Sequence, residues 1–260
     1  MAEVVIVEDA AAAGEIAAAQ IAELVGRAPD AVLGLATGST PLTTWAALAR
    51  RGLDLSRVRG FALDEYVGLP AGHPESYRAV ITREVVEPLG LTPSLVHVPA
   101  EGRRGDEYAT AGADYEALID AAGGVDLQIL GIGRTGHIGF NEPGSSFASL
   151  TRVKTLTERT RLDNARFFGG DLEAVPRHCI TQGLGTILRA RQLVLLAFGE
   201  GKAEALAAAV EGPLTASMPA SAIQLHRDVL VLADEAAAAR LRYADYYRYA
   251  WEHRPEWARG

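Results

Sequence analysis

Residues 130–147, LGIGRTGHIGFNEPGSSF, place a histidine and a glutamate in a segment that contains five glycines. The segment directly follows the apolar run at residues 125–132. An imidazole has an ordinary pKa near ~6.5, so His137 could exchange protons at physiological pH, and Glu142 could act as its partner. A strand that ends in glycines and then presents these two side chains predicts an active-site loop.

Two other interpretations of the glycines remain open. They could simply permit tight turns, because glycine accepts positive φ angles. Residues 131–136 also match the G-x-G-x-x-G fingerprint of a dinucleotide-binding loop, which requires a helix directly after the glycines. Here Pro143 and two further glycines follow, and these disfavour a regular helix. We therefore favour the active-site loop.

A carboxylate follows another apolar stretch. Residues 58–63 are predicted to form a strand, and Asp64 comes directly after it. Ligands of open α/β sheets bind beyond the carboxyl ends of parallel strands, so Asp64 is a candidate general base. The alternative is an Asx-turn or a helix cap, which are common roles for an aspartate after a strand.

Two strand-to-helix junctions could hold a phosphate. Residues 37–41, TGSTP, precede a helix predicted at 42–51, and backbone N–H groups, hydroxyls and the helix dipole suit an anion there. Simple capping by Ser39 or Thr40 is the alternative. Lys202 precedes a second such helix, and residues 151–166 supply further cations, although such a segment is commonly a solvated face.

Alternating strand and helix patterns predict an α/β fold with a mainly parallel sheet and helices on both faces. Strands are expected at residues 4–7, 31–36, 58–63, 95–98, 125–132, 192–198 and 229–232. Helices are expected at residues 10–25, 42–51, 77–86, 105–122, 203–210 and 234–249. Without a low-complexity linker or a repeat, residues 1–260 should form a single domain. The segment 151–176 could act as a lid, because the glycine pair at 169–170 permits hinge motion.

Composition excludes several classes of protein. A net charge of -8 and a pI near 5.3 argue against a nucleic-acid-binding surface. The single cysteine, Cys179, allows no intrachain disulfide, which fits a reducing cytoplasm, and the ligand spacings of zinc fingers are absent. There is no apolar run of about 18 residues and no signal-peptide pattern, so we expect a cytoplasmic protein.

Several motifs together resemble the glucosamine-6-phosphate deaminase family. They are LGLATGSTPL at 33–42, LDEYVGL at 63–69, HPESY at 73–77, GHIGFNEPGSS at 136–146, TRVKTLTERTR at 151–161, NARFF at 164–168 and GKAEAL at 201–206. The resemblance implies a Rossmann-like three-layer αβα fold. It also implies a hydrolase of amino-sugar catabolism that converts glucosamine 6-phosphate and water into fructose 6-phosphate and ammonia, without a cofactor or an obligatory metal.

The resemblance also implies roles for individual residues. Asp64 matches the base that moves a proton between C2 and C1, and His137 matches the group that opens the sugar ring, with Glu142 as its partner. The positions that hold the substrate phosphate are matched by Gly38, Ser39, Thr40, Arg166 and Lys202. These contacts would orient C1 and C2 against the base.

One catalytic position departs from the family pattern. Thr135 stands where the commonest form of the loop has an aspartate, two residues before the histidine. A carboxylate there would fix the imidazole tautomer, whereas a threonine can hydrogen-bond but brings no charge. Activity, pH dependence or substrate preference could therefore differ. The alternatives are a sugar-phosphate sensor without catalysis and a related lactonase.

The resemblance raises the question of regulation as well. Allosteric members bind an amino-sugar phosphate between subunits at positions matched here by Ser145, Ser146, Arg152, Lys154 and Thr155. Leu150 replaces an expected arginine, and the alternative is that the cations merely solvate a strand. Assembly into a homo-oligomer and allosteric activation are expectations that the sequence leaves open.

Overall fold

The computed structural model describes residues 2–255, and its centre is a seven-stranded parallel sheet with the order β1-β10-β9-β6-β2-β3-β5. Its strands are β1 (Glu3–Val7), β2 (Val32–Leu35), β3 (Arg59–Ala62), β5 (Val96–His97), β6 (Leu127–Gly131), β9 (Gln192–Ala197) and β10 (Val229–Asp234). The central strands are almost entirely buried, as expected when helices cover both faces of a parallel sheet. Their continuous apolar runs follow from this environment.

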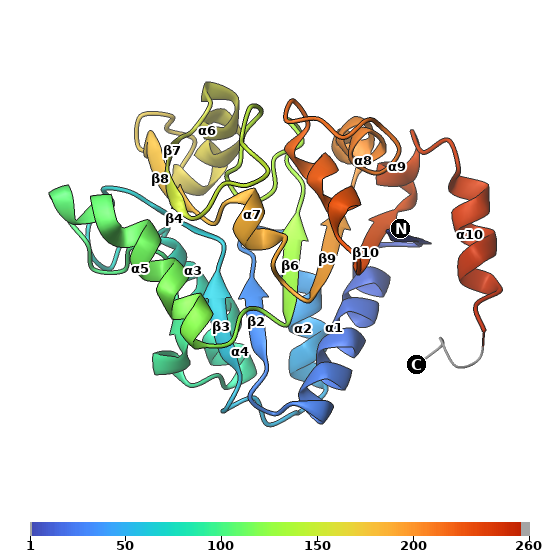
Figure 1. The fold of residues 1–260 in the computed structure, drawn as a ribbon, viewed down its shortest axis with the longest axis horizontal. Coiled ribbons are helices and arrows are strands. Elements are labelled where there is room, and N and C mark those ends of the chain that lie inside the picture. The colour runs from blue at the N-terminus through green and yellow to red at the C-terminus, as the bar shows by residue number, and fades with distance from the viewer. Residues whose placement is uncertain (1, 256–260) are drawn as a thin grey trace.

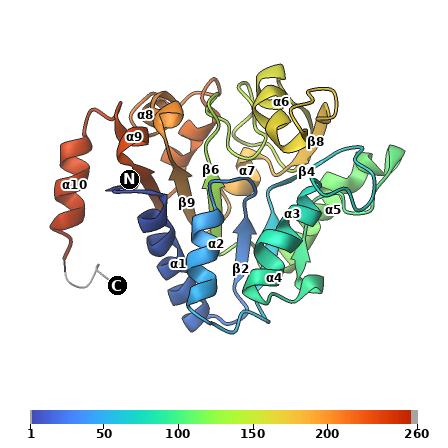
Figure 2. The same cartoon turned by 180° about the vertical axis from the view of Figure 1, so that it is seen from behind.

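Helices form the two outer layers. One face is covered by α1 (Ala10–Arg27), α2 (Leu42–Arg50), α3 (Tyr77–Ile81), a π-helical turn (Thr82–Val86) and α4 (Glu87–Leu89) (Figure 2). The other face carries α5 (Tyr108–Ala121) and α7 (Leu184–Ile187) (Figure 1). The chain also forms α8 (Ala203–Val210), which follows β9. The predicted Rossmann-like three-layer fold is confirmed.

A second, antiparallel sheet lies beyond the carboxyl end of β3 (Figure 1). It consists of β4 (Asp64–Tyr66), β8 (His178–Thr181) and β7 (Arg152–Thr155), with β8 in the middle. Sequence analysis missed this sheet, because three short strands far apart in the chain carry little periodicity of their own. Asp64 consequently does not end a parallel strand but begins β4, where it pairs with Thr181.

The segment 151–176 is largely regular structure. It contains β7, α6 (Glu158–Asn164) and a 3-10 helix (Ala165–Phe168) that continues α6 without a break. Gly169 ends this helix with φ of 65°, and the N–H of Gly170 donates to the carbonyl of Ala165 at 2.8 Å. The glycine pair therefore serves as a helix end, and its use as a hinge stays a prediction.

The prediction of one continuous helix at residues 234–249 is wrong. The structure has α9 (Glu235–Ala238) and α10 (Ala244–Glu252), separated by a short connection. The N–H groups of Arg242 and Tyr243 donate to the carboxylate of Glu211, at 2.8 and 3.0 Å, so they make no helical bonds. Helix α10 then packs beside the edge strand β1 (Figure 1). Within residues 2–255, no helix combines the length and apolar character needed to cross a membrane.

Candidate active site

A pocket of about 240 Å³ opens at the carboxyl ends of the central strands. Its lining includes side chains from β4, from the loops after β2 and β6, from the 3-10 helix after α6, and from the start of α8. Among the residues predicted from the sequence, the pocket is lined by Asp64, His137, Gly38, Ser39, Thr40, Arg166 and Lys202. Residues up to 164 positions apart in the chain thus meet around one cavity.

Asp64 is a buried carboxylate without a hydrogen-bond partner. Its exposed fraction is 6%, and none of the side-chain hydrogen bonds within residues 2–255 involves it. Burial raises the pKa of Asp64 well above its usual value, and the nearby charge of Glu65 acts in the same direction. A carboxyl group with a raised pKa and a free face toward a pocket is suited to take a proton from a ligand.

Glu65 holds β4 in place, and sequence analysis gave it no role. Its carboxylate accepts hydrogen bonds from the N–H groups of Tyr66, Tyr77 and Arg78, at 2.7 to 2.8 Å. The last two N–H groups belong to the first turn of α3, where backbone donors lack helical partners. Glu65 therefore fixes α3 against β4. A glutamate next to a catalytic candidate was the available clue, but two of its three partners are backbone N–H groups 12 and 13 positions further along the chain.

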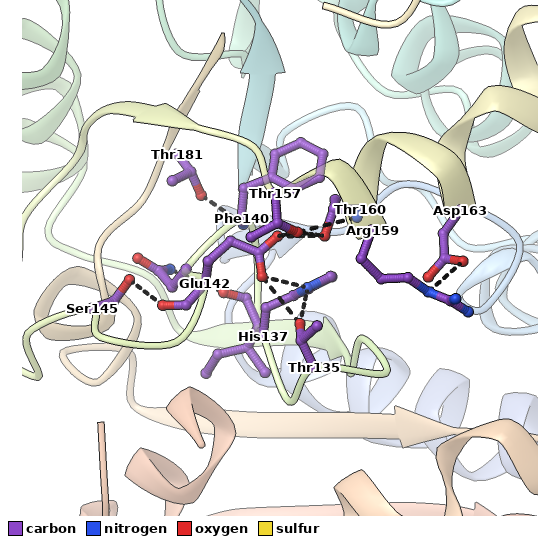
Figure 3. Close-up of polar contacts among 12 residues, drawn as sticks. Thr135, His137, Phe140, Glu142, Ser145, Thr157, Arg159, Thr160, Asp163 and Thr181 are labelled. Carbon is purple, nitrogen blue, oxygen red and sulfur yellow. Dashed lines mark hydrogen bonds and ion pairs between the residues drawn. The ribbon is translucent and has the colours of Figure 1, made fainter. Parts of the chain in front are cut away.

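Thr135 bridges His137 and Glu142 (Figure 3). Its hydroxyl donates to Glu142 Oε2 at 3.1 Å and lies 2.9 Å from His137 Nδ1, which is 3.5 Å from the same carboxylate oxygen. Because the hydroxyl proton is used on the carboxylate, the oxygen accepts from Nδ1–H. This arrangement leaves Nε2 of the neutral imidazole as the basic nitrogen. Thr135 thus orients the ring by hydrogen bonding.

Glu142 lies behind His137, and neither it nor Thr135 lines the pocket. Its second oxygen, Oε1, accepts hydrogen bonds from the hydroxyls of Thr157, at 3.0 Å, and of Thr160. Burial would raise the pKa of Glu142, but His137 and the two threonine hydroxyls outweigh this effect and lower the pKa to about 2. Glu142 therefore remains ionised. The Thr157 and Thr160 contacts were not predicted, since α6 follows the glycine loop only after an intervening strand.

The opposite end of the pocket is cationic and hydroxyl-lined. The N-cap of α2 is Pro41, without a side-chain capping bond, so Ser39 and Thr40 do not cap this helix. Burial lowers the pKa of Lys202, and the charges of Arg134 and Arg166 lower it further, while Asp163 opposes them. Several cations therefore lie close together. An anion bound among them would relieve their mutual repulsion.

An aromatic wall closes one side of the pocket. It consists of Tyr66, Tyr77, Phe140 and Phe168, with ring centroids 4.8 to 5.9 Å apart in the contacting pairs. Asn164 donates to the Tyr66 hydroxyl at 3.0 Å. Sequence analysis assigned no role to these rings, although each lies within one of the quoted motifs. They give the pocket an apolar side next to Asp64.

A glycine is required at position 133 because of the histidine. A Cβ atom built there would lie 2.2 Å from Cε1 and Nε2 of His137, far inside van der Waals contact. The His137 ring therefore packs directly against the Gly133 backbone. This close approach, rather than nucleotide binding, explains the glycine at position 133 of the G-x-G-x-x-G string at residues 131–136.

The residues predicted for allosteric binding lie outside the pocket lining. Ser145 donates to the Glu142 carbonyl at 2.7 Å, and Arg152 donates to Asn141 Oδ1 at 2.7 Å. Ser146 accepts from the N–H of Ala148, and Thr155 lies 3.3 Å from His178 Nδ1. Lys154 and Thr155 belong to β7. Their contacts are consistent with structural roles, and effector binding stays a prediction.

The fold and the site define a sugar-phosphate enzyme of the α/β class. The family described as "Glucosamine-6-phosphate isomerases/6-phosphogluconolactonase" matches residues 7–232, and the chain belongs to this family. It is similar to glucosamine-6-phosphate deaminase of Bifidobacterium longum subsp. infantis, with 60% identity over 267 residues and 99% of each chain covered. The corresponding protein of Streptomyces coelicolor is 58% identical over 259 residues, covering 98% of each chain.

Solved structures give the same result for the fold. A monomeric glucosamine-6-phosphate deaminase superposes with a TM-score of 0.87 at 40% identity, covering 92% of this chain and 99% of the other. A 6-phosphogluconolactonase from Trypanosoma brucei reaches a TM-score of 0.75 at 18% identity, covering 93% and 99%. Because its identity is 18%, the similarity to the lactonase concerns the fold alone.

Proposed function

We propose that this protein is a glucosamine-6-phosphate deaminase of amino-sugar catabolism, which converts glucosamine 6-phosphate and water into fructose 6-phosphate and ammonia. The observation that carries the proposal is the single pocket in which an unpaired, buried Asp64, an oriented His137 and a cationic end containing Lys202 face one another. Relatives at about 60% identity over the whole chain carry the deaminase name.

In this proposal the substrate phosphate lies against Gly38, Ser39, Thr40, Arg166 and Lys202. Binding energy from this remote group places the reacting carbons near Asp64. Thr135 and Glu142 hold the imidazole, and His137 transfers the proton that opens the pyranose ring and frees the C1 aldehyde. These residue roles are our assignments.

Asp64 then takes the proton from C2, and the electrons form a C1–C2 double bond as the C1 oxygen gains a proton. Return of a proton to C1 converts this enolamine into the C2 imine. Water adds to C2, ammonia leaves, and the ketone of fructose 6-phosphate remains. The raised pKa of Asp64 brings its basicity closer to that of the carbon acid it must deprotonate.

The alternative activities fit less well. Lactonases share the fold at 18 to 22% identity, which does not carry their activity to this chain. A sensor without catalysis was suggested by Thr135, but this residue keeps hydrogen bonds to both His137 and Glu142. The expected label of hydrolase is not supported for this chain, since its relatives at about 60% identity are named glucosamine-6-phosphate deaminases.

Ammonia release from a panel of 2-amino-2-deoxyhexose 6-phosphates tests the proposal. We expect release from glucosamine 6-phosphate, with fructose 6-phosphate as the second product. Hydrolysis of 6-phosphogluconolactone without any ammonia from the amino sugars would instead identify a lactonase. Binding of the amino-sugar phosphate without turnover would identify a sensor. Cytoplasmic location and homo-oligomeric assembly stay predictions, and the related solved deaminase is described as monomeric.

A further inference from the structure

Helix α6 runs from the residues behind His137 to the cationic end of the pocket. At its beginning, the hydroxyls of Thr157 and Thr160 donate to Glu142 Oε1, behind the imidazole of His137 (Figure 3). At its end, Asn164 lines the pocket, and the adjoining 3-10 helix contributes Arg166 to the cationic end. One continuous helical element therefore joins the group that orients His137 to the groups that face the substrate phosphate.

The Glu142 carboxylate is divided between two sets of partners. Oε2 faces Thr135 and His137 within its own loop, whereas Oε1 faces only the two hydroxyls of α6. A carboxylate held at one oxygen can still rotate about its terminal torsion, which is broad. Hydrogen bonds at Oε1 remove this freedom. The orientation of Oε2 toward the imidazole side thus depends on α6.

Thr160 is buried where it contacts Glu142. Its exposed fraction is 2%, so water cannot replace its hydroxyl. Thr157 is at the same time the N-cap of α6, where its oxygen accepts from the Thr160 N–H at 3.1 Å. The two hydroxyls also lie 3.1 Å apart. These hydrogen bonds fix the start of α6 relative to the Glu142 carboxylate.

We propose that Thr157 and Thr160 are positioning residues, which hold Glu142 in the orientation that supports His137 and thereby couple phosphate binding through α6 to the ring-opening group. The inference rests on the proposed function for its link to turnover. Neither threonine touches the pocket, so each acts only through Glu142. The variants below leave the surrounding charged and titratable groups in place, so a change in the pH profile can be attributed to the lost hydroxyl. These groups are Asp64 on β4, Cys179 on β8, Arg152 on β7, Arg134 in the glycine loop, Glu158, Arg159, Arg161 and Asp163 on α6, Arg166 in the 3-10 helix and Lys202 before α8.

The central test replaces Thr160 by valine, which keeps the shape of the side chain and removes the hydroxyl. We expect kcat and kcat/KM for ammonia release to fall together by about tenfold, with KM changed by less than about twofold, because a hydrogen bond to a charged group is lost behind the binding site. Thr160→Ser should restore most of the activity. The pH profile of kcat should also differ from that of the wild type, because the carboxylate behind His137 loses the hydrogen bond that orients it.

Thr186 offers a matched control. It is 5% exposed, and its hydroxyl donates at 2.6 Å to a buried carboxylate, Glu116; neither residue belongs to the pocket lining. Thr186→Val removes the same kind of bond and should cost similar stability. We expect its pH profile to match that of the wild-type protein. An equal shift of the profile in T186V and T160V would show that the effect is merely structural and would overturn the proposal.

A measurement without turnover separates this inference from the proposed function. Nitrogen NMR of His137 should show the neutral ring with its proton on Nδ1 in the wild type and in T186V, and an increased share of the Nε2–H tautomer in T160V. Added inorganic phosphate should change the His137 resonances less in T160V than in the wild type. Identical tautomers and phosphate responses in T160V and wild type would overturn the proposal, whatever the substrate proves to be.

These experiments distinguish failure of the proposed function from failure of the positioning role. If the wild-type protein releases no ammonia, the proposed function fails, while the NMR comparison still decides the role of the threonines. If ammonia is released and T160V behaves like the wild type in every readout, the positioning role fails alone. Should T160V not fold, Thr160→Ala is the second variant for the same measurements.

Discussion

At the scale of single residues, the site pairs groups whose environments push their proton affinities apart. Asp64 is buried without a partner, and its pKa is raised, whereas Glu142 receives four polar contacts and its pKa is lowered to about 2. Such a division commonly separates a proton-transferring acid or base from a charge that orients its neighbour. Asp64 is accordingly the residue whose replacement should change the chemistry most directly.

Asp64→Asn should lower kcat by about 10² to 10⁴, the usual contribution of a positioned general base, while substrate affinity changes little. The reason is that the amide cannot accept the C2 proton, and the phosphate contacts remain. Deuterium exchange at C2 of glucosamine 6-phosphate in heavy water measures the step directly. Exchange at the wild-type rate in D64N would remove Asp64 from the proposed mechanism.

The same variant should be more stable than the wild type at neutral pH. The folded-state pKa of Asp64 is raised, so between its unfolded pKa, about 3.9, and its folded pKa the native state binds more protons than the unfolded state. Stability from this group therefore falls as pH rises through that window, and the uncharged amide of the variant has no such loss. Urea unfolding from pH 4 to pH 8 measures the difference.

We expect the stability gap between D64N and the wild type to widen upward from about pH 4. The control is Asp30→Asn, which makes the same substitution at an exposed position. A gap that is constant with pH would mean that Asp64 does not titrate differently in the folded state.

At the scale of elements, the glycine loop after β6 determines where the imidazole of His137 lies. Gly133 lies in contact with the His137 ring, and the Gly133 N–H donates to the His137 carbonyl at 2.9 Å. The ring is thus confined between its own loop backbone and the Thr135 hydroxyl. The loop tolerates little change, since backbone on one side and a hydrogen bond on the other determine where the ring lies.

Gly133→Ala should reduce kcat by at least about tenfold, because the new methyl group displaces the imidazole from its near-attack position. Gly26→Ala is the control: it lies in α1 with nothing within 4 Å of the added Cβ, and should raise stability by about 0.5 to 1 kcal/mol. Steady-state kinetics and thermal unfolding of both variants provide the comparison. Full activity in G133A would contradict the packing argument.

At the scale of the whole molecule, an acidic protein keeps a cationic end in its pocket. The net charge is -8, and the chain contains two lysines, of which Lys202 lines the pocket and Lys154 does not. Burial and neighbouring arginines lower the pKa of Lys202, so this cluster opposes folding until an anion binds. The stability of the whole protein should therefore depend on the bound phosphate.

Fructose 6-phosphate at about 100 times its Kd should stabilise the wild type by about 2.7 kcal/mol, which raises Tm by roughly 5 to 10 °C for a domain of this size. Lys202→Ala should lose most of this shift at the same ligand concentration, because its phosphate contact is gone. Lys154→Ala should retain the shift. Calorimetry with and without ligand measures all three proteins, and a full shift in K202A would place the phosphate elsewhere.

The sequence by itself determined the order of the parallel strands and major helices along the chain. It also contained the motifs around Asp64, His137 and Lys202, because apolar periodicity, glycines and helix starts are local features. Thr135 was recognisable in the same way as the departure from the family loop. The error at residues 234–249 arose where a distant carboxylate, Glu211, binds the backbone N–H groups of Arg242 and Tyr243.

Only the tertiary structure decided what surrounds these residues. Strand β4 pairs with β8 across more than a hundred positions, Glu65 reaches the start of α3, and the threonines at the start of α6 reach Glu142. Hydrogen bonds between segments distant in sequence leave no periodic pattern in either segment. Their existence depends on which surfaces the folded core brings together, and this is where the electrostatic character of Asp64 and Glu142 is set.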